Sequence, residues 1–360
     1  MRIYYLLLFY FIFIYSLKKI KIPLNRNTII YLYAIPIFLI IALRDFSVGT
    51  DTFMYQIMFE RSIFNLKHYG TEMLSLRKEP LFWLTAAIIQ FVVGSDRVYF
   101  AIMALIMIFS LSIFIIRHSK FPMISFWLYV TLGYLGLSMS GLRQMLAISI
   151  TFLGFKYLIN GNWVKYIITI LIAVMFHFSA IVMIPIYYLR KIHLNKKGKI
   201  GILFVSVILG FLVKDIILRL IFSFNVMSRY SVYESSVGNV QTNPLVVVVA
   251  LGISTVSLIL YQRNAGNLED KFKNSFDILF IMSCLNIITL IISLDLAIVS
   301  RVGYYFSICN IILLPNAIAT IRDKWVRLLM ISGALMISLS QFLISTPGDF
   351  LRIDNYKFFW

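Results

Sequence analysis

The stretch TIIYLYAIPIFLIIAL (residues 28–43), followed directly by RDFSVGTD (residues 44–51), decides the fold of this chain. The apolar run approaches the length of about 20 residues with which a helix crosses a bilayer. Two ionised side chains, Arg44 and Asp45, and a Gly-Thr-Asp turn stand at its end. Such groups are costly at a membrane boundary unless they face water, each other or a ligand. The stretch predicts a membrane span that ends in a polar site, with a simple helix cap and turn as the alternative.

The composition of the whole chain indicates an integral membrane protein. Of its 360 residues, 61% are hydrophobic and 13% are charged, and the mean hydropathy is +0.89. Soluble domains average about 45–50% apolar and about 25% charged residues. We therefore expect an all-α, polytopic membrane protein that forms a single domain over residues 1–360, with about 10–13 membrane helices in one bundle, some of them short or re-entrant.

Apolar runs of helical length give the expected helices. They cover residues 2–17, 28–43, 81–93, 98–116, 121–138, 142–159, 163–176, 178–189, 200–222, 244–262, 276–294, 302–321 and 326–345. The first run resembles the apolar region of a signal peptide, but no small-residue cleavage site follows it, so we expect a retained span.

The net charge of +18 comes from basic residues in short loops, around residues 18–26, 190–199, 263–273 and 322–327. This distribution is typical of cytoplasmic loops, so we expect the bilayer, and no nucleic acid, as the partner of this charge. Cys284 and Cys309 both fall in apolar runs, and the sequence has neither a metal-ligand spacing nor a phosphate-binding GxxxxGK[ST] loop. We expect no metal and no cofactor.

With the basic loops inside, the span at residues 28–43 delivers Arg44 to the outer face. Residues 163–189 form either one helix that buries His177 mid-membrane or a hairpin that turns at His177. The hairpin keeps Lys156 and Lys165 inside, and it requires an odd number of crossings in residues 44–117. We expect residues 81–93 to dip into the outer leaflet and return, residues 98–116 to cross, and residues 52–66 to form an interfacial amphipathic helix.

In this topology the unusual polar residues collect at the outer face: Arg44, Asp45, Asp51, Glu79, Arg143, Gln144, His177, Arg229, Arg301 and Tyr356. Several arginines around one cavity suit a phosphate or pyrophosphate, because the guanidinium fork binds oxyanions through two hydrogen bonds. His177 is a candidate proton acceptor.

Each of these residues also has a structural interpretation. Arg143 begins an apolar run as a helix-end arginine would, and His177 on an apolar stretch is typical of a hydrogen-bonded core histidine. Glu79-Pro80 is a favourable start for a helix, so it has a structural explanation that requires no function. Arg301, followed by aromatic residues, suits an anchor at the membrane interface.

The order of these motifs resembles the EpsG-like family of bacterial surface-polysaccharide polymerases, which includes Wzy-type O-antigen polymerases. The resemblance rests on Arg44-Asp45-x-x-Val48-Gly49-Thr50-Asp51-x-x-x-Tyr55, Glu79-Pro80, Gly141-Leu142-Arg143-Gln144-x-Leu146-Ala147, His177-x-Ser179-Ala180 and Arg301-x-x-Tyr304-Tyr305-Phe306. It runs over most of the chain, to about residue 310. Thr52 departs from the pattern, since an aromatic residue commonly follows Gly-Thr-Asp in the family.

The resemblance implies an enzyme of the bacterial inner membrane that works at the periplasmic face. It would join oligosaccharide repeat units carried on undecaprenyl pyrophosphate, releasing that carrier, with a chain-length regulator as a further partner. It implies Asp51 or His177 as the general base, and Arg143, with Arg229 and Arg301, as the groups that stabilise the leaving pyrophosphate. Arg44, Asp45, Thr50, Glu79, Gln144 and Tyr304 are then expected to bind substrate.

Three other functions remain open from the sequence. A flippase for the same lipid-linked sugar also needs many spans and a polar cavity, although we expect its ionisable residues at both faces. An O-antigen ligase or another membrane glycosyltransferase uses a similar donor. A third possibility is a purely structural membrane subunit, but such a role does not explain the Arg-Gln and Gly-Thr-Asp motifs.

Overall fold

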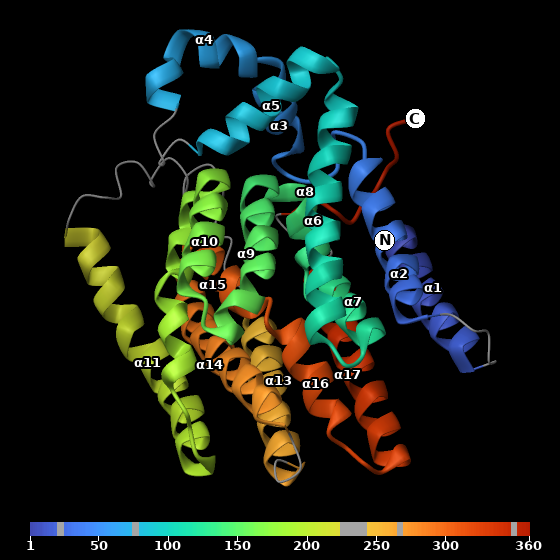
Figure 1. Cartoon of the computed structure of the whole chain (residues 1–360), viewed down its shortest axis with the longest axis vertical. Coiled ribbons are helices and arrows are strands. Elements are labelled where there is room, and N and C mark those ends of the chain that lie inside the picture. Colours follow the sequence, from blue (N-terminus) through green and yellow to red (C-terminus); the bar gives the residue numbers. More distant parts are fainter. Residues whose placement is uncertain (20–24, 74–78, 224–242, 265–268, 347–350) are drawn as a thin grey trace. The chain divides into compact units, whose positions relative to one another are not determined.

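The computed structural model describes residues 1–19, 25–73, 79–223, 243–264, 269–346 and 351–360 (Figure 1). The chain divides into two compact units, the first made of Met1–Tyr188 and Ile331–Trp360, the second of Leu189–Met330. Within the described ranges the regular structure is helical, apart from one isolated antiparallel bridge between Arg44 and Phe358. The fold is that of an all-α, polytopic membrane protein, as the composition predicts.

In the described part of the chain, six helical stretches are long and apolar enough to cross a bilayer. They are α6 (Asp96–His118), α9 (Leu142–Asn160), α13 (Pro244–Asn264), Phe272–Ser293 within α14 (Asp270–Ser293), Ser300–Ala319 and α17 (Lys324–Ser345). A seventh is broken into α7 (Pro122–Thr131) and α8 (Tyr134–Ser140), which meet at 55°. Shorter apolar helices are α1 (Arg2–Lys19), α2 (Arg26–Ala42), α5 (Pro80–Val92) and α10 (Trp163–Phe176).

Local chemistry sets several of these boundaries. Asn25 accepts a hydrogen bond from the Thr28 N–H at 2.8 Å and begins α2, and Asn162 does the same for the Lys165 N–H at 3.1 Å and begins α10. Gly133, with φ +89°, separates α7 from α8, a conformation that residues with a Cβ rarely adopt. The sequence predicted one helix over residues 121–138, and this glycine is the reason for the break.

The first unit is a set of packed helices in which α2 lies against α6, α6 against α9, and α9 against α10. Edge-to-face aromatic pairs fill its core, such as Phe11 with Tyr33, whose ring centroids are 5.3 Å apart. Two short helices, α3 (Thr52–Glu60) and α4 (Ser62–Met73), lie with α5 at one end of this unit (Figure 1). They replace the single amphipathic helix expected over residues 52–66.

Residues 163–188 form the predicted hairpin. After α10 the chain turns at His177 and returns through two 3₁₀ helices, η2 (Phe178–Met183) and η3 (Pro185–Lys191). The Tyr166 hydroxyl donates to the Met183 carbonyl and the Tyr187 hydroxyl to the Gly161 carbonyl, both at 2.6 Å. The return segment is not the expected α-helix, and Pro185, which has no N–H for an α-helical hydrogen bond, begins its second half.

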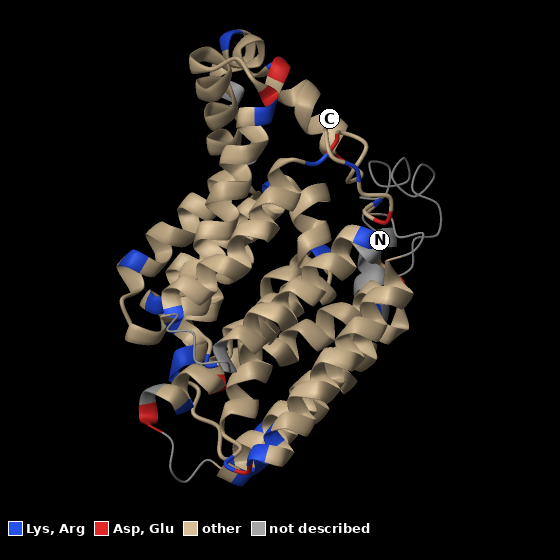
Figure 2. Ribbon diagram, turned by 90° about the vertical axis from the view of Figure 1, so that its right-hand side faces the viewer, with Lys and Arg blue, Asp and Glu red and all other residues tan. Residues whose placement is uncertain are grey.

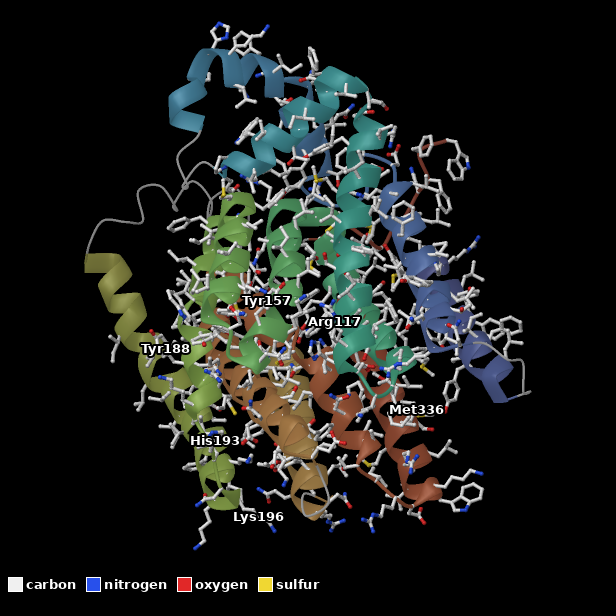
Figure 3. All side chains as sticks on the ribbon, in the orientation of Figure 1. Arg117, Tyr157, Tyr188, His193, Lys196 and Met336 are labelled. Atoms are coloured by element: carbon white, nitrogen blue, oxygen red, sulfur yellow. The ribbon has the colours of Figure 1, made fainter. Side chains whose placement is uncertain are left out.

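Helices α9 and α10 run in opposite directions, so the first unit has two chemically different ends. Arg143 and His177 lie at one end, while Lys156 and Lys165 lie at the other, both beside the Tyr157 ring. Figure 3 labels Arg117 and Tyr157 near this second end, which we call the basic end. In the ribbon of Figure 2, the positions of Lys, Arg, Asp and Glu lie mostly at helix ends and connections.

The crossing pattern of residues 44–117 follows from α6. Arg97 in its first turn donates to the Arg44 carbonyl at 3.0 Å, and Arg117 in its last turn is at the basic end. Helix α5 begins at Pro80, directly after Glu79, which pairs with Arg143, and it ends a few residues before α6. Among the described residues of the range 44–117, α6 alone is long and apolar enough to cross a bilayer, and α5 is a shorter apolar helix.

The second unit packs α11 (Lys196–Ser223) against α14, with α13, η6 (Ala297–Val299), α15 (Ser300–Ser307) and α16 (Asn310–Ala319) around them. Hydrogen bonds between buried polar side chains connect its helices. The Ser283 hydroxyl on α14 is hydrogen-bonded to the Ser254 hydroxyl on α13 at 2.6 Å and to Asn310 Oδ1 on α16 at 2.7 Å. At one end of this unit Lys199 pairs with Asp277 at 2.9 Å, both side chains being buried.

Candidate active site

Glu79 joins two of the residues that the sequence singled out as catalytic. Its Oε2 lies 2.6 Å from the Arg143 guanidinium nitrogen NH1, and its Oε1 is hydrogen-bonded to His177 Nδ1. The three residues are separated by 64 and 98 positions in the sequence, so the fold alone brings them together. This group, Glu79 with Arg143 and His177, is called the ionic triad below.

Three different helix ends position the triad. Glu79 precedes α5 with a left-handed φ of +58°, Pro80 being the first helical residue. Arg143 is the second residue of α9, and His177 ends α10 with an extended backbone. A left-handed conformation costs a residue with a Cβ about 1–3 kcal/mol, and it persists where the surroundings hold it in place. Here the two hydrogen bonds of the carboxylate provide that support.

The charges of the triad are unequally exposed. The Glu79 side chain is 7% exposed, that of His177 is 18% exposed and that of Arg143 is 34% exposed. Burial raises the pKa of Glu79, but the hydrogen bonds and charges of His177 and Arg143 outweigh it, so the net pKa lies below the ordinary value. Glu79 is an ionised anchor, and the two residues it holds are the ones accessible to a ligand.

Aromatic side chains surround the Arg143 guanidinium. Its central carbon lies 5.7 Å from the Phe82 ring centroid and 5.9 Å from that of Tyr55, and the Tyr55 side chain is also a hydrogen-bond partner. Among the described residues, buried Arg143 Nε has no hydrogen-bond partner. A spare, desolvated donor next to an exposed guanidinium face suits an incoming oxyanion.

Arg44 lies beside this site but is buried, with 2% of the residue exposed. Its guanidinium donates to the Met139 carbonyl at 3.3 Å, to the Thr52 hydroxyl at 3.4 Å and to the Ile41 carbonyl. We expected Arg44 to line an outward cavity. In the structure its donors instead bind two backbone carbonyls and the Thr52 hydroxyl, and the bond to Met139 holds the end of α2 against the end of α8.

The Gly-Thr-Asp segment packs on the end of α8, just before α9 begins. Gly49 has φ +90°, and a Cβ there would lie 2.7 Å from Thr52 Oγ1 and 2.9 Å from the Met139 carbonyl oxygen. The Thr50 N–H donates to Ser140 Oγ at 3.2 Å, and Asp51 precedes α3, one turn before Tyr55. Asp45 accepts from the N–H and hydroxyl of Ser47, and these bonds hold its pKa below the ordinary value.

The remaining predicted residues are distributed as follows. Gln144 is buried next to Arg143 on α9. Arg301 and Tyr304 lie on α15, which belongs to the second unit. Arg229 lies outside the described residues. Sequence reasoning did not assign roles to Tyr55, Thr52 or Ser140, and the signal for Tyr55 was present in the Gly-Thr-Asp motif that contains it.

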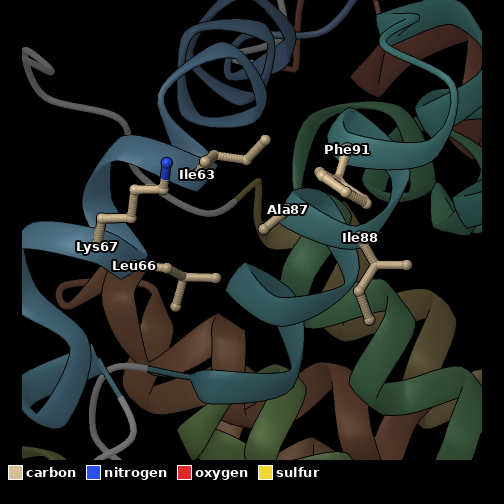
Figure 4. A pocket seen from close by; sticks show the side chains of 6 residues that line it. All are labelled: Ile63, Leu66, Lys67, Ala87, Ile88 and Phe91. Atoms are coloured by element: carbon tan, nitrogen blue, oxygen red, sulfur yellow. The ribbon is translucent and has the colours of Figure 1, made fainter.

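No three His, Cys, Asp or Glu side chains within the described ranges lie close enough to hold a metal ion. A pocket of about 350 Å³ lies between α4 and α5, lined by Ile63, Leu66, Lys67, Ala87, Ile88 and Phe91 (Figure 4). Its lining is apolar except for Lys67, and it includes no residue of the triad.

These features define a class, a multi-pass helical membrane protein whose first unit has an ionic site at the end opposite to its basic end. A family model described as the EpsG family matches residues 27–358. The chain belongs to the EpsG family, and is thus a polysaccharide-polymerase-like membrane protein with a glycosyltransferase-like role. No curated protein and no solved structure gives a significant match.

Proposed function

We propose that this protein polymerises oligosaccharide repeat units linked to undecaprenyl pyrophosphate, at the periplasmic face of the bacterial inner membrane. The observation that carries the proposal is the ionic triad, in which one buried carboxylate holds a guanidinium and an imidazole side by side. Glycosyl transfer from a pyrophosphate needs a cation for the leaving group and a base for the acceptor hydroxyl.

The reaction is a substitution at the anomeric carbon of the donor. The oxygen of the acceptor hydroxyl forms a new bond to this carbon, and the bond from the carbon to the pyrophosphate oxygen breaks. The electron pair of the broken bond leaves with undecaprenyl pyrophosphate. The proton of the hydroxyl goes to His177, so charge and atoms balance.

Each member of the triad has a distinct role in this proposal. Because His177 Nδ1 is bonded to the Glu79 carboxylate, Nε2 is the nitrogen that takes the proton. Glu79 orients the ring and stabilises its protonated form, as the aspartate of a Ser-His-Asp triad does for its histidine. Arg143, the most exposed of the three, stabilises the charge that develops on the leaving pyrophosphate.

The distribution of basic residues supports the proposed membrane face. Lys156, Lys165 and Arg117 lie at the end of the first unit opposite to the triad. Basic residues flanking spans favour the cytoplasmic side. The arrangement supports a periplasmic triad, where lipid-linked repeat units are joined.

The test is a deletion of the gene in its own bacterium, complemented with wild-type, Arg143→Ala or Arg61→Ala chains at equal protein level. Arg61 is an exposed arginine next to α3, outside the triad, and serves as the matched control. We expect the wild-type and Arg61→Ala chains to restore long polymer on gels of the surface glycan, and Arg143→Ala to leave single repeat units.

Other outcomes separate the competing functions. Loss of all surface units in the deletion strain, with lipid-linked units accumulating inside, would indicate a flippase. Polymer that stays on its carrier would indicate a ligase. Full-length polymer from the Arg143→Ala chain would refute the role of Arg143 at the pyrophosphate.

A further inference from the structure

The last ten residues, Leu351–Trp360, lie along residues 43–49, in the loop that connects α2 to α3. We call this segment the tail. The Asp45 N–H donates to the Lys357 carbonyl at 2.9 Å, and the Phe359 N–H donates to the Leu43 carbonyl at 3.2 Å. These two hydrogen bonds form the antiparallel bridge between Arg44 and Phe358. The tail therefore pairs with the backbone on both sides of Arg44.

A second set of contacts connects the tail to the Gly-Thr-Asp segment. The Gly49 N–H donates to the Arg352 carbonyl at 3.2 Å, and Arg352 has a left-handed φ of +49°. Ile353 is 2% exposed, and its Cδ1 lies 2.8 Å from where a Cβ on Gly136 of α8 would be. Since a side chain at residue 136 would collide with the tail, the close approach of tail and α8 requires this glycine.

Ser140 is the point where three segments meet. Its hydroxyl donates to the Leu351 carbonyl of the tail at 2.8 Å and accepts from the Thr50 N–H at 3.2 Å. Gly141 follows, and Arg143 is three residues beyond Ser140 at the start of α9. The same hydroxyl thus ties the tail and the Gly-Thr-Asp segment to the helix end that carries the guanidinium of the triad.

Arg97 contacts both the tail and the loop with which the tail pairs. Its guanidinium lies 3.7 Å from the Phe46 ring centroid and 4.7 Å from that of Phe359, so it stacks with the loop and with the tail. It also donates to the Arg44 carbonyl at 3.0 Å. Contacts between a guanidinium and aromatic faces are worth roughly 0.5–2 kcal/mol each, which favours an ordered tail.

We propose that the tail is a positioning segment of the active site, which acts through Ser140 to set the place of Arg143. This inference rests on the proposed function for its kinetic consequence. The physical reason is the precision that group transfer needs, because a displacement of about 1 Å costs up to about 100-fold in rate. The tail and Ser140 touch no reacting atom in this proposal, and their effect passes through the start of α9.

The kinetic test compares Ser140→Ala with Ser138→Ala, in membranes supplied with lipid-linked repeat units extracted from the deletion strain. Ser138 is the matched control, since it is buried on the same helix and makes two hydrogen bonds, to Tyr129 and the Tyr134 carbonyl, away from the tail. We expect Ser140→Ala to lower kcat on the order of 10-fold or more, with KM changed by less than about threefold. Equal kcat values for the two variants would overturn the proposal.

A second test needs no enzymatic activity. Hydrogen exchange of the amides in residues 45–52 is compared between the full chain and a chain that ends at Thr346. We expect exchange at Asp45 and Gly49 to become about fivefold faster or more, while amides within α13 stay unchanged. Unchanged exchange at both residues would refute the positioning role. If the wild-type chain makes no polymer, the proposed function fails, and this experiment still decides the role of the tail.

Discussion

The Glu79 carboxylate divides its two oxygens between Arg143 and His177, Oε2 bonding the guanidinium at 2.6 Å and Oε1 bonding the imidazole. A single carboxylate that serves two partners fixes their mutual distance. It also means that a change at Glu79 disturbs the binding of the leaving group and the orientation of the base together. The first two predictions follow from this relationship.

Glu79→Gln keeps the shape of the side chain and the strained backbone but removes the negative charge. We expect a fall in the polymerisation rate on the order of 100-fold, because His177 loses the group that stabilises its protonated form. Polymer length and rate in complemented cells, normalised to protein level, provide the measurement. Glu60→Gln, an exposed glutamate at the end of α3, is the control. Wild-type rates in Glu79→Gln would contradict the role of the triad.

Glu79 and His177 should act as one unit. We expect Glu79→Gln and His177→Gln, when combined, to lose little more activity than the worse single variant, with a coupling energy of about 0.5–3 kcal/mol. The measurement is a double-mutant cycle on the polymerisation rate. Strictly additive losses would show that the hydrogen bond between them does not matter for the reaction.

The pKa of Glu79 gives a pH dependence of stability. Since this carboxyl has a pKa below its ordinary value of 4.5 in the folded chain, it binds its proton more weakly there than when unfolded. Its contribution to stability is thus fully present above pH 4.5 and is lost as the pH falls through the lower, folded value. We expect the difference in unfolding temperature between wild type and Glu79→Gln, measured in detergent, to shrink as the pH falls below 4.5. A difference that grows on acidification would contradict this.

Gly49→Ala tests the close approach of the Gly-Thr-Asp segment to α8. The positive φ and the 2.9 Å contact with the Met139 carbonyl oxygen predict a loss of about 1–3 kcal/mol in stability, together with a loss of polymer. Thermal unfolding in detergent measures the first effect. Gly252→Ala on α13 is the control, because a Cβ there meets no atom within 4 Å. Equal stability of the two variants would show that residue 49 tolerates a side chain.

The buried pair of Lys199 and Asp277 gives a prediction independent of the active site. Lys199→Met or Asp277→Leu alone leaves an unpaired buried charge, so we expect each to lower stability by about 3–5 kcal/mol. The combined variant should recover most of this loss and polymerise normally. Unfolding temperatures and polymer length test both statements, and a double variant as unstable as the singles would contradict them.

Much of the fold was predictable, because lipid requires each span to satisfy its own backbone as a helix and to be apolar. The apolar runs at residues 98–116 and 142–159 correspond to α6 and α9, and the turn at His177 was one of two expected arrangements. The bend at Gly133 and the 3₁₀ return after His177 were not foreseen. They depend on packing and local hydrogen bonds that hydropathy does not report.

The residues of the site were named from the sequence, but their arrangement was not. Glu79 has a sufficient local explanation as the residue before a helix-starting proline, so nothing in its neighbourhood indicated a contact with Arg143 or His177. Arg44 was expected to face outward, whereas Met139 and Thr52 supply acceptors for it in the interior. Contacts across 95 or 98 residues depend on the tertiary fold, which one sequence does not show.

The hydrogen bond of 3.0 Å between Arg97 and the Arg44 carbonyl also joins the two ends of the segment that contains α3, α4 and α5. Residues 45–96 therefore form a segment whose two flanking residues, Arg44 and Arg97, are in contact. Replacing this segment with a longer or shorter one changes the loop-closure entropy little, since this cost grows with the logarithm of length. Chimeras that exchange residues 53–73 between relatives, while keeping Glu79 and the two arginines, can alter the surface around the site and leave the membrane-crossing framework intact.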